Sequence, residues 1–301
     1  MRRVLIAGLA LCAALPATAS AALEPSAHRG TAGDAADLRG FEASALARGE
    51  RRFHSQAARK AYSTGVAAYV YGLAPISVTN TVPRFPRNQI TSIGELVEPA
   101  VRTVVAPNVD TTYTVGQIDL SDGPLVVDVP DTKGRYYVLQ FMDAYSNTFA
   151  YVGRRTTGTK QGSYVLVPPG YSGALPAGAK PLRSPTNLIW LIGRTLVKSA
   201  ADVPAVTQLM GGYRLTPLAR WSAGERAAPL VLASFPPMLN KLVLPTGLAY
   251  FDQLGAALAA NPPPTGDACA LKAIGAVGIG PGLTPSTQAT GAVRTALAAA
   301  A

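Results

Sequence analysis

The chain has few of the residues on which metal centres and disulfide scaffolds depend. Its 301 residues include only two histidines and two cysteines. A zinc site normally recruits several histidine or cysteine ligands, so the sequence predicts no metal site. Two cysteines cannot staple a disulfide-rich domain, and the fold must therefore be stabilised by a hydrophobic core.

The short motifs of common enzyme classes are also missing. The chain contains no G-x-S-x-G elbow, no P-loop and no G-x-G-x-x-G following a strand-like run. Both histidines, His28 and His54, precede the β-rich region, and we expect His54 to be exposed or to lie at a helix start. These absences predict a protein without a bound cofactor.

The first 21 residues have the three parts of a secretory signal peptide. Arg2 and Arg3 form a positive start, Val4–Leu15 is an apolar run, and residues 19–21 are a small-residue cleavage pattern. The apolar run is shorter than the roughly 20 residues that a spanning helix needs. We therefore predict cleavage after Ala21, a secreted or periplasmic protein, and no transmembrane segment after cleavage.

Cleavage would change the charge and the cysteine count. Loss of Arg2 and Arg3 lowers the net charge from +10 to +8, which still favours a polar or anionic ligand. The remaining basic residues are scattered rather than clustered, so no nucleic-acid partner is expected. Loss of Cys12 would leave Cys269 as the one cysteine, which we expect to be a buried, small apolar residue.

Short β-like runs alternate with Gly/Pro turns in the middle of the chain. The predicted strands are Thr112–Leu120, Leu125–Val129, Arg135–Asp143, Thr148–Thr157, Ser163–Val167 and Leu188–Val197. A helical stripe over Ser55–Leu73 precedes them, and helices starting near Asp202, Thr246 and Asp267 follow. The pattern predicts an α+β fold that is mainly β, with an antiparallel β-sandwich or barrel core, an N-terminal helix and C-terminal helices.

The same patterns divide the chain into four parts. Residues 1–21 are the predicted signal peptide, and residues 22–54 lack lasting periodicity, which is typical of a flexible leader. The β-rich domain with its flanking helices is predicted over residues 55–282. Residues 283–301 contain few large apolar side chains and are predicted to be a frayed tail.

Several strings are shared with one bacterial family. They are Tyr71-Gly72, PNVDTTY (Pro107–Tyr113), GRYYVLQFMDAYSNTFAYVGRRTTGT (Gly134–Thr159), SPTNLIWLIGRTLV (Ser184–Val197), NPPP (Asn261–Pro264) and VGIGPG (Val277–Gly282). Through them the chain resembles the family called domain of unknown function 1254, from about Tyr62 to Gly282. Family members often carry a second β-rich domain, domain of unknown function 1214, which would begin where this chain stops. The resemblance implies an exported, β-rich protein without settled chemistry, working alone or with a separately encoded β-rich partner.

Two charged residues fall on faces that the two-residue strand period makes apolar. Asp143 shares a face with Tyr137, Leu139 and Phe141, and Arg194 lies among Leu188, Trp190, Ile192 and Leu196. A charge on an apolar face is costly unless it is paired. We therefore predict that Asp143 and Arg194 lie inside the β domain with ionic partners, each other among the candidates. The pair would be a buried structural contact or a carboxylate and an arginine in a ligand pocket.

A second cluster surrounds a proline-containing segment. Asn108 and Asp110 have side chains that commonly build a turn, and the alternative is a turn that aims Asp110 and Tyr113 into a pocket. Arg154 and Arg155 are expected on opposite faces of one strand, so that only one of them lines the same cavity, and Arg155 is our candidate.

Three functions stay open at this point. The first is an exported protein that binds a polar or anionic ligand through Asn108, Tyr113, Arg155 and Arg194. The second is a cofactor-free hydrolase or lyase in which Asp110 and Asp143 act as acid and base. The third is a non-catalytic subunit of an envelope or secreted assembly, a homo-oligomer included, whose β edges join.

Overall fold

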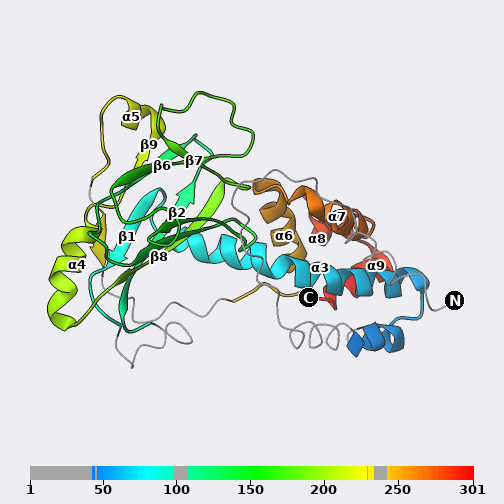
Figure 1. Ribbon diagram of the computed structural model, residues 1–301. Helices are drawn as coiled ribbons and strands as arrows, with labels where there is room; N and C mark the ends of the chain where they lie inside the picture. The colour runs from blue at the N-terminus through cyan, green and yellow to red at the C-terminus, as the bar shows by residue number, and fades with distance from the viewer. Residues whose placement is uncertain (1–42, 45, 98–107, 229, 234–242) are drawn as a thin grey trace. The chain divides into compact units, whose positions relative to one another are not determined.

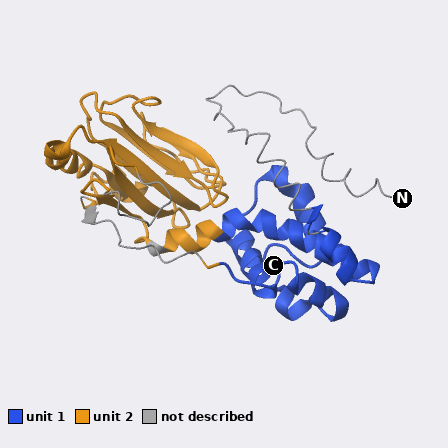
Figure 2. Ribbon diagram, turned by 90° about the horizontal axis from the view of Figure 1, so that it is seen from below, with its two compact units in different colours: residues 1–76, 244–301 blue, residues 77–243 orange. Residues whose placement is uncertain are grey.

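The computed structural model describes residues 43–44, 46–97, 108–228, 230–233 and 243–301 (Figure 1). The predicted signal peptide and most of the predicted leader therefore lie outside the described residues. The chain divides into two compact units, residues 1–76 with 244–301 and residues 77–243 (Figure 2). The sequence predicts a single domain over residues 55–282, whereas the structure separates a β unit from a helical unit.

The β unit contains two sheets. The larger has six strands in the order β10-β1-β2-β8-β4-β5, and its neighbours are antiparallel except β1 and β10, which run parallel. The smaller has the order β7-β6-β3-β9, with β6 and β7 parallel. Their bounds are β1 Gln89–Ile93, β2 Thr111–Asp119, β3 Leu125–Val129, β4 Tyr137–Met142, β5 Thr148–Gly153, β6 Gly162–Val167, β7 Lys180–Arg183, β8 Leu188–Leu196, β9 Arg214–Pro217 and β10 Val231–Ala233.

One hydrophobic core joins the two sheets. Leu139 and Ile189 from the larger sheet are fully buried in the same cluster as Val127 and Leu166 from the smaller sheet. Alternate side chains of each strand therefore point toward the facing sheet, as in a β-sandwich. The predicted α+β fold with a β-rich core is confirmed.

The other unit is helical. It contains most of α3 (Gln56–Thr81), together with α6 (Leu248–Ala260), α7 (Ala268–Gly275), α8 (Pro285–Gln288) and α9 (Gly291–Ala298). The Oγ of Ser55 accepts a hydrogen bond from the Ala58 amide at 3.1 Å, which is the predicted cap of α3. None of the helices that the structure describes is both long and apolar enough to span a bilayer.

Two features of this unit differ from the sequence prediction. The segment predicted as a frayed tail carries α8 and α9, and Leu297 of α9 is fully buried. Small residues allow this packing, because a Cβ added at Gly65 would lie 2.8 Å from the Cβ of Ala300. Cys269 is exposed in α7, so its predicted burial is wrong.

Candidate functional site

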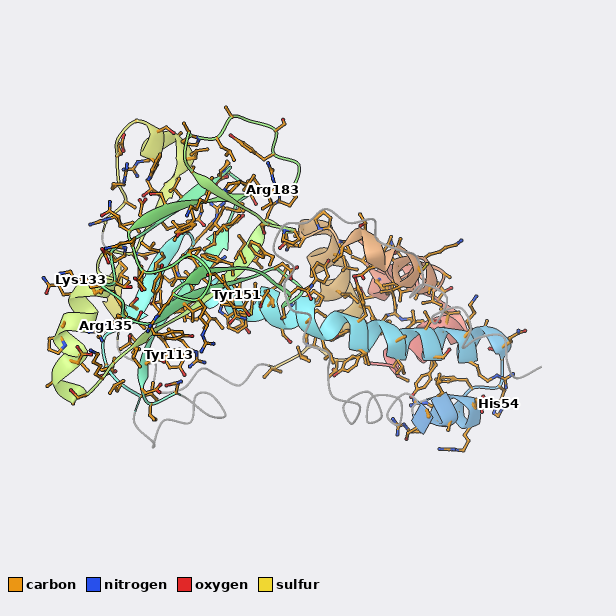
Figure 3. All side chains as sticks on the ribbon, viewed as in Figure 1. His54, Tyr113, Lys133, Arg135, Tyr151 and Arg183 are labelled. Carbon is orange, nitrogen blue, oxygen red and sulfur yellow. The ribbon has the colours of Figure 1, made fainter. Side chains whose placement is uncertain are left out.

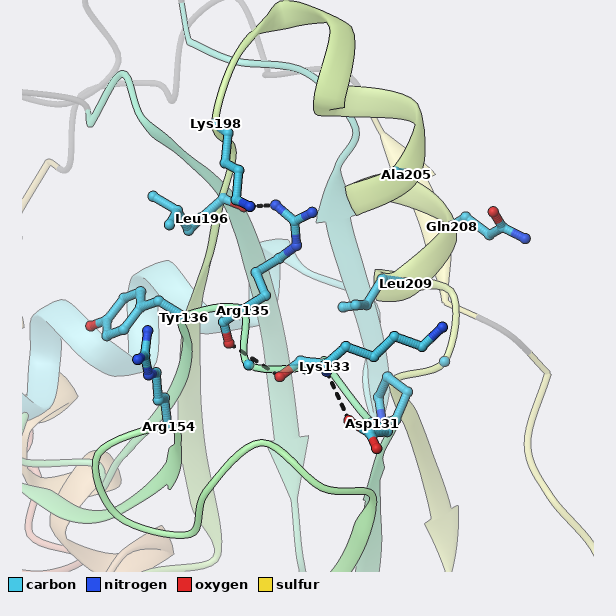
Figure 4. A pocket seen from close by; sticks show the side chains of 14 residues that line it. Asp131, Lys133, Arg135, Tyr136, Arg154, Leu196, Lys198, Ala205, Gln208 and Leu209 are labelled. Carbon is cyan, nitrogen blue, oxygen red and sulfur yellow. Dashed lines mark hydrogen bonds between the residues drawn. The ribbon is translucent and has the colours of Figure 1, made fainter.

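A pocket of about 740 Å³ opens at one end of the β unit, beside the turn that joins β3 to β4 (Figure 4). Helix α4 (Val203–Met210) and the end of β8 complete its wall. The lining residues are Pro130, Asp131, Thr132, Lys133, Gly134, Arg135, Tyr136, Arg154, Leu196, Lys198, Ala205, Gln208, Leu209 and Gly212. Four of them carry a positive charge and one carries a negative charge.

The turn holds Lys133 at the edge of this pocket. Asp131 Oδ1 accepts the Lys133 amide at 2.8 Å, and the Arg135 amide donates to the Thr132 carbonyl at 2.9 Å. Lys133 and Gly134 have φ values of 50° and 79°, so the chain reverses through two left-handed residues. The exposed Lys133 side chain leaves the turn beside Asp131, and Figure 3 shows Lys133 and Arg135 close together in the β unit.

Arg135 is committed to an ion pair within the protein. Its Nη1 lies 2.6 Å from Asp202 Oδ2, and its Nη2 donates to Asp202 Oδ1 at 2.9 Å. Nη1 also donates to the Leu196 carbonyl at 2.8 Å. The Arg135 hydrogen bonds and the Lys198 amide lower the pKa of Asp202 to about 2, so the pair stays charged near neutral pH. Arg135 thus ties the start of α4 to the end of β8.

The three other positively charged lining residues differ from Arg135 in their partners. Among the described residues, Lys133, Arg154 and Lys198 form no ion pair, whereas the lining carboxylate of Asp131 lies 3.2 Å from Lys160 Nζ. The uncharged part of the lining combines apolar residues (Pro130, Leu196, Ala205 and Leu209) with Thr132, Tyr136, Gln208 and two glycines. Low-dielectric walls strengthen the field of the cations, so the pocket favours a negatively charged occupant.

The structure brings three of the sequence-predicted ligand-binding residues together. Tyr113 and Arg194 are register partners on β2 and β8, and Arg194 Nη1 donates to Tyr113 Oη at 3.0 Å. The guanidinium carbon also lies 4.7 Å from the centre of the tyrosine ring, a cation–π contact. The Asn108 amide donates to the same hydroxyl at 2.7 Å.

The predicted burial of Arg194 inside the β domain is nevertheless wrong. Ile189, Leu191 and Thr195 of β8 are the residues that point into the core, and Arg194 lies on the opposite, half-exposed face. Its partner is the ring of Tyr113, not a carboxylate. The error arises because both faces of β8 are apolar in sequence, so the period alone does not say which one is inside.

Asp143 is buried, as predicted, but it belongs to a turn. It is 2% exposed, and its Oδ1 accepts the amides of Tyr145 at 2.8 Å and Asn147 at 2.9 Å. Its Oδ2 accepts Asn147 Nδ2 at 3.3 Å. Burial raises the pKa of this carboxyl, and the hydrogen bonds oppose that rise. Asp143 has no ionic partner among the described residues, so the predicted pairing with Arg194 is wrong.

Asp110 lies far from Asp143 along the sheet. Asn108 Oδ1 accepts the amides of Asp110 at 2.9 Å and Thr111 at 3.2 Å, which is the turn interpretation of this cluster. Thr111 pairs with Leu196 of β8, whereas Met142 pairs with Trp190. Six residues of strand correspond to about 20 Å. Glycosidase carboxylates stand less than about 10 Å apart, so Asp110 and Asp143 do not form an acid–base pair of that kind.

Arg154 and Arg155 lie in a turn, not in a strand. β5 ends at Gly153, whose carbonyl accepts the amides of Thr156 at 3.0 Å and Thr157 at 2.8 Å. The prediction that the two arginines point to opposite faces of a strand is therefore wrong. Arg154 lines the pocket, and the guanidinium carbon of Arg155 lies 5.5 Å from the ring centre of Tyr136, another lining residue.

No metal cluster is found in the part of the chain that the structure describes, where no three His, Cys, Asp or Glu side chains are placed to hold an ion. His54 is exposed, as expected, just before α3 in the helical unit (Figure 3). Sequence reasoning missed Lys133, Arg135, Arg154 and Lys198 as lining residues. The run of Asp, Lys, Gly and Arg in the β3–β4 turn was the available signal for two of them.

Comparison with known proteins agrees with the fold. Residues 87–217 match the family model described as "Protein of unknown function (DUF1254)". The crystal structure of the VPA0106 protein from Vibrio parahaemolyticus is similar with a TM-score of 0.60 and 23% identity, over 80% of this chain and 56% of that one. This chain thus spans little more than half of that protein. An uncharacterized protein from Burkholderia cenocepacia gives a TM-score of 0.29 and 12% identity, over 66% of this chain and 54% of its own. No curated protein matches the chain.

Proposed function

We propose that the β unit, which contains the residues 87–217 that match the DUF1254 family model, binds an anionic ligand. The proposal rests on one observation. Three positively charged residues that form no ion pair among the described residues, Lys133, Arg154 and Lys198, line one pocket of about 740 Å³. Pockets of this size accommodate small organic molecules.

The geometry supports binding more than catalysis. Arg135 and Asp202 satisfy each other and hold the wall, so the pocket is shaped before any ligand enters. The lining carboxylate of Asp131 already accepts hydrogen bonds from the Lys133 amide and from Lys160 Nζ. An anion entering the pocket would therefore meet donors without displacing an internal carboxylate.

Replacing Arg154 by glutamine is expected to weaken binding of citrate, a tricarboxylate probe, about tenfold, because hydrogen bonds to charged groups contribute about 1.5–3 kcal/mol. Lys133→Gln should have a smaller effect, since a lysine ammonium cannot form the two parallel hydrogen bonds that a guanidinium makes with a carboxylate. Isothermal titration calorimetry of the purified mature protein measures both. The affinity of the unmodified protein should also fall as salt is raised.

The matched control for these variants is Arg183→Gln. Arg183 is an exposed arginine of β7 in the smaller sheet and does not line the pocket (Figure 3). Its replacement removes the same charge from the same unit and should leave citrate affinity unchanged. Equal losses in the Arg154 and Arg183 variants, or no citrate binding by the unmodified protein, would refute the proposed site.

We also propose that the protein works outside the cytoplasm after cleavage behind Ala21. The charged start, short apolar run and small-residue end of residues 1–21 support this. Mass spectrometry of the protein from periplasmic and secreted fractions should find a chain that begins at Ala22. An uncleaved chain confined to the cytoplasm would contradict the proposal.

A further inference from the structure

The helical unit contains a cavity of its own. Its volume is about 360 Å³, and its walls come from the first turns of α3, the end of α7, α8 and the start of α9, which Figure 1 labels. All of the lining residues belong to this unit, so the cavity shares none of them with the pocket of the β unit. Its size falls within the range of small-molecule sites.

Small residues leave this cavity open. Ala57 and Ala61 lie one turn apart on the same face of α3, and Ala276 and Ala289, which follow α7 and α8, also line it. Apart from its own chain neighbours, nothing lies within 4 Å of a Cβ added at Gly278, another lining residue. Since packed protein normally fills such space with side chains, the cavity is room that a second molecule can occupy.

The walls of this cavity are aliphatic. Apart from Lys60, Gln288 and Thr290, the lining residues are alanine, valine, proline and glycine. None of the described lining residues carries a carboxylate or an aromatic ring. Such walls favour an aliphatic group of a ligand, because its burial removes apolar surface from water.

Lys60 gives the cavity its single charge. It stands three residues after Ala57 on α3, and side chains at this spacing are neighbours on a helix surface. Lys60 is exposed, and it forms no ion pair with any carboxylate of the described chain. A lysine can lay its methylene stem along apolar surface and keep its ammonium in water. The cavity thus combines apolar walls with one positive charge that has no anionic partner.

We propose that this cavity binds an aliphatic monoanion, with its chain against the alanine and valine side chains and its charged group on the Lys60 ammonium. The inference goes beyond the proposed function, because the two cavities lie in different units and neither depends on the other. A lysine ammonium is a point charge that does not impose the geometry of one anionic group. The ligand class is therefore set by the aliphatic chain and the single negative charge.

Other charge types fit this cavity less well. A cationic amphiphile would bring a second positive charge beside Lys60, and the described lining offers no carboxylate to offset it. A polyanion would leave its further charges against aliphatic walls, where a charge without a partner is costly. An uncharged aliphatic molecule would gain the apolar contacts alone.

Affinity should depend on both chain length and charge. Calorimetry of the mature protein, with each probe below its critical micelle concentration, should show octanoate binding at least about tenfold more tightly than butyrate, because the longer chain buries more apolar surface. Octyl sulfate should bind about as tightly as octanoate. Octan-1-ol should bind about fivefold more weakly, which is the upper end for one exposed ion pair.

Two variants address the charge and the cavity separately. Lys60→Gln should weaken octanoate binding about fivefold and leave octan-1-ol binding unchanged, an outcome that a general loss of structure would not give. Ala57→Leu should fill the space and weaken both ligands at least about tenfold. Ala57 is exposed and leucine is a good helix former, so this variant should fold, as circular dichroism verifies. The matched controls, Lys272→Gln and Ala273→Leu, change exposed residues of α7 that do not line the cavity.

The outcomes separate this inference from the proposed function. Equal affinity for octanoate and butyrate, or full octanoate affinity in Ala57→Leu, overturns the aliphatic site. Full octanoate affinity in Lys60→Gln overturns the monoanion. Octanoate binding that is lost in Arg154→Gln assigns the probe to the β unit and also overturns the site, whereas the citrate results have no bearing on it. A dimer in sedimentation velocity that Ala57→Leu dissociates replaces the ligand with a second copy of the chain.

Discussion

Replacing Gly153 by alanine is expected to lower the free energy of unfolding by about 3 kcal/mol, the upper end for overpacking. An added Cβ would lie 2.4 Å from the Tyr137 carbonyl oxygen and 2.9 Å from the Val138 Cα. Both atoms belong to the backbone of β4, which cannot move aside as a flexible side chain can. Urea denaturation followed by circular dichroism measures the loss.

The same substitution should also weaken ligand binding. The Gly153 carbonyl anchors the turn that carries Arg154 and Arg155, so a displaced strand end moves both arginines. Gly275→Ala is the control, because nothing lies within 4 Å of a Cβ added there and alanine suits a helix better than glycine. A Gly153→Ala protein as stable as the Gly275→Ala protein would contradict the close approach of β5 to β4.

Strands with strong local signals could be predicted from the sequence alone. β3 lies between two turns rich in Asp, Gly and Pro, and its observed bounds, Leu125–Val129, are those predicted. β1, β7, β9 and β10 are not among the predicted strands. β7 (Lys180–Arg183) and β9 (Arg214–Pro217) are four residues long and each contains a proline, which weakens the strand signal. Their pairing depends on strands elsewhere in the chain, which no local pattern reports.

The candidate site could be predicted only in part, for a similar reason. The turn cluster points to Tyr113 and the apolar face of β8 points to Arg194, but periodicity does not report their register pairing. Lys198 follows β8 and Lys133 lies in the β3–β4 turn, so only the folded β unit brings them to one pocket. The sequence identified Tyr113, Arg155 and Arg194 as candidates, but neither their arginine–tyrosine contacts nor the cavity lined by Lys133, Arg154 and Lys198.

Arg194 also shows how a correct period can give a wrong location. Trp190, Ile192 and Leu196 flank it on one face, while Ile189 and Leu191 occupy the other. Both sets are apolar in sequence, yet along β8 one face is buried in the core and the other is only half-buried. Which face of β8 is buried depends on the smaller sheet, because that sheet packs against only one face of the larger sheet.

Asp143→Ala is the second substitution with a large expected effect, a loss of about 3 kcal/mol in the free energy of unfolding, since each buried unpaired donor costs about 1–3 kcal/mol. The Asp143 carboxylate accepts the amides of Tyr145 and Asn147, and alanine leaves both without an acceptor. Asp143→Asn should cost less, because its amide oxygen can still accept at the Oδ1 position. Thermal and urea unfolding measure both variants.

Asp110→Ala is the matched control, since the Asp110 side chain is exposed and its backbone amide keeps the bond to Asn108. Its expected effect is within about 0.5 kcal/mol, as for ordinary surface substitutions. If Asp143→Ala lowers the free energy of unfolding, the carboxylate acts as a structural hydrogen-bond acceptor in the β4–β5 turn. Loss of a catalytic acid or base would instead lower turnover and leave stability largely unchanged. An Asp143→Ala protein as stable as the Asp110→Ala protein would therefore return Asp143 to the candidates for chemistry.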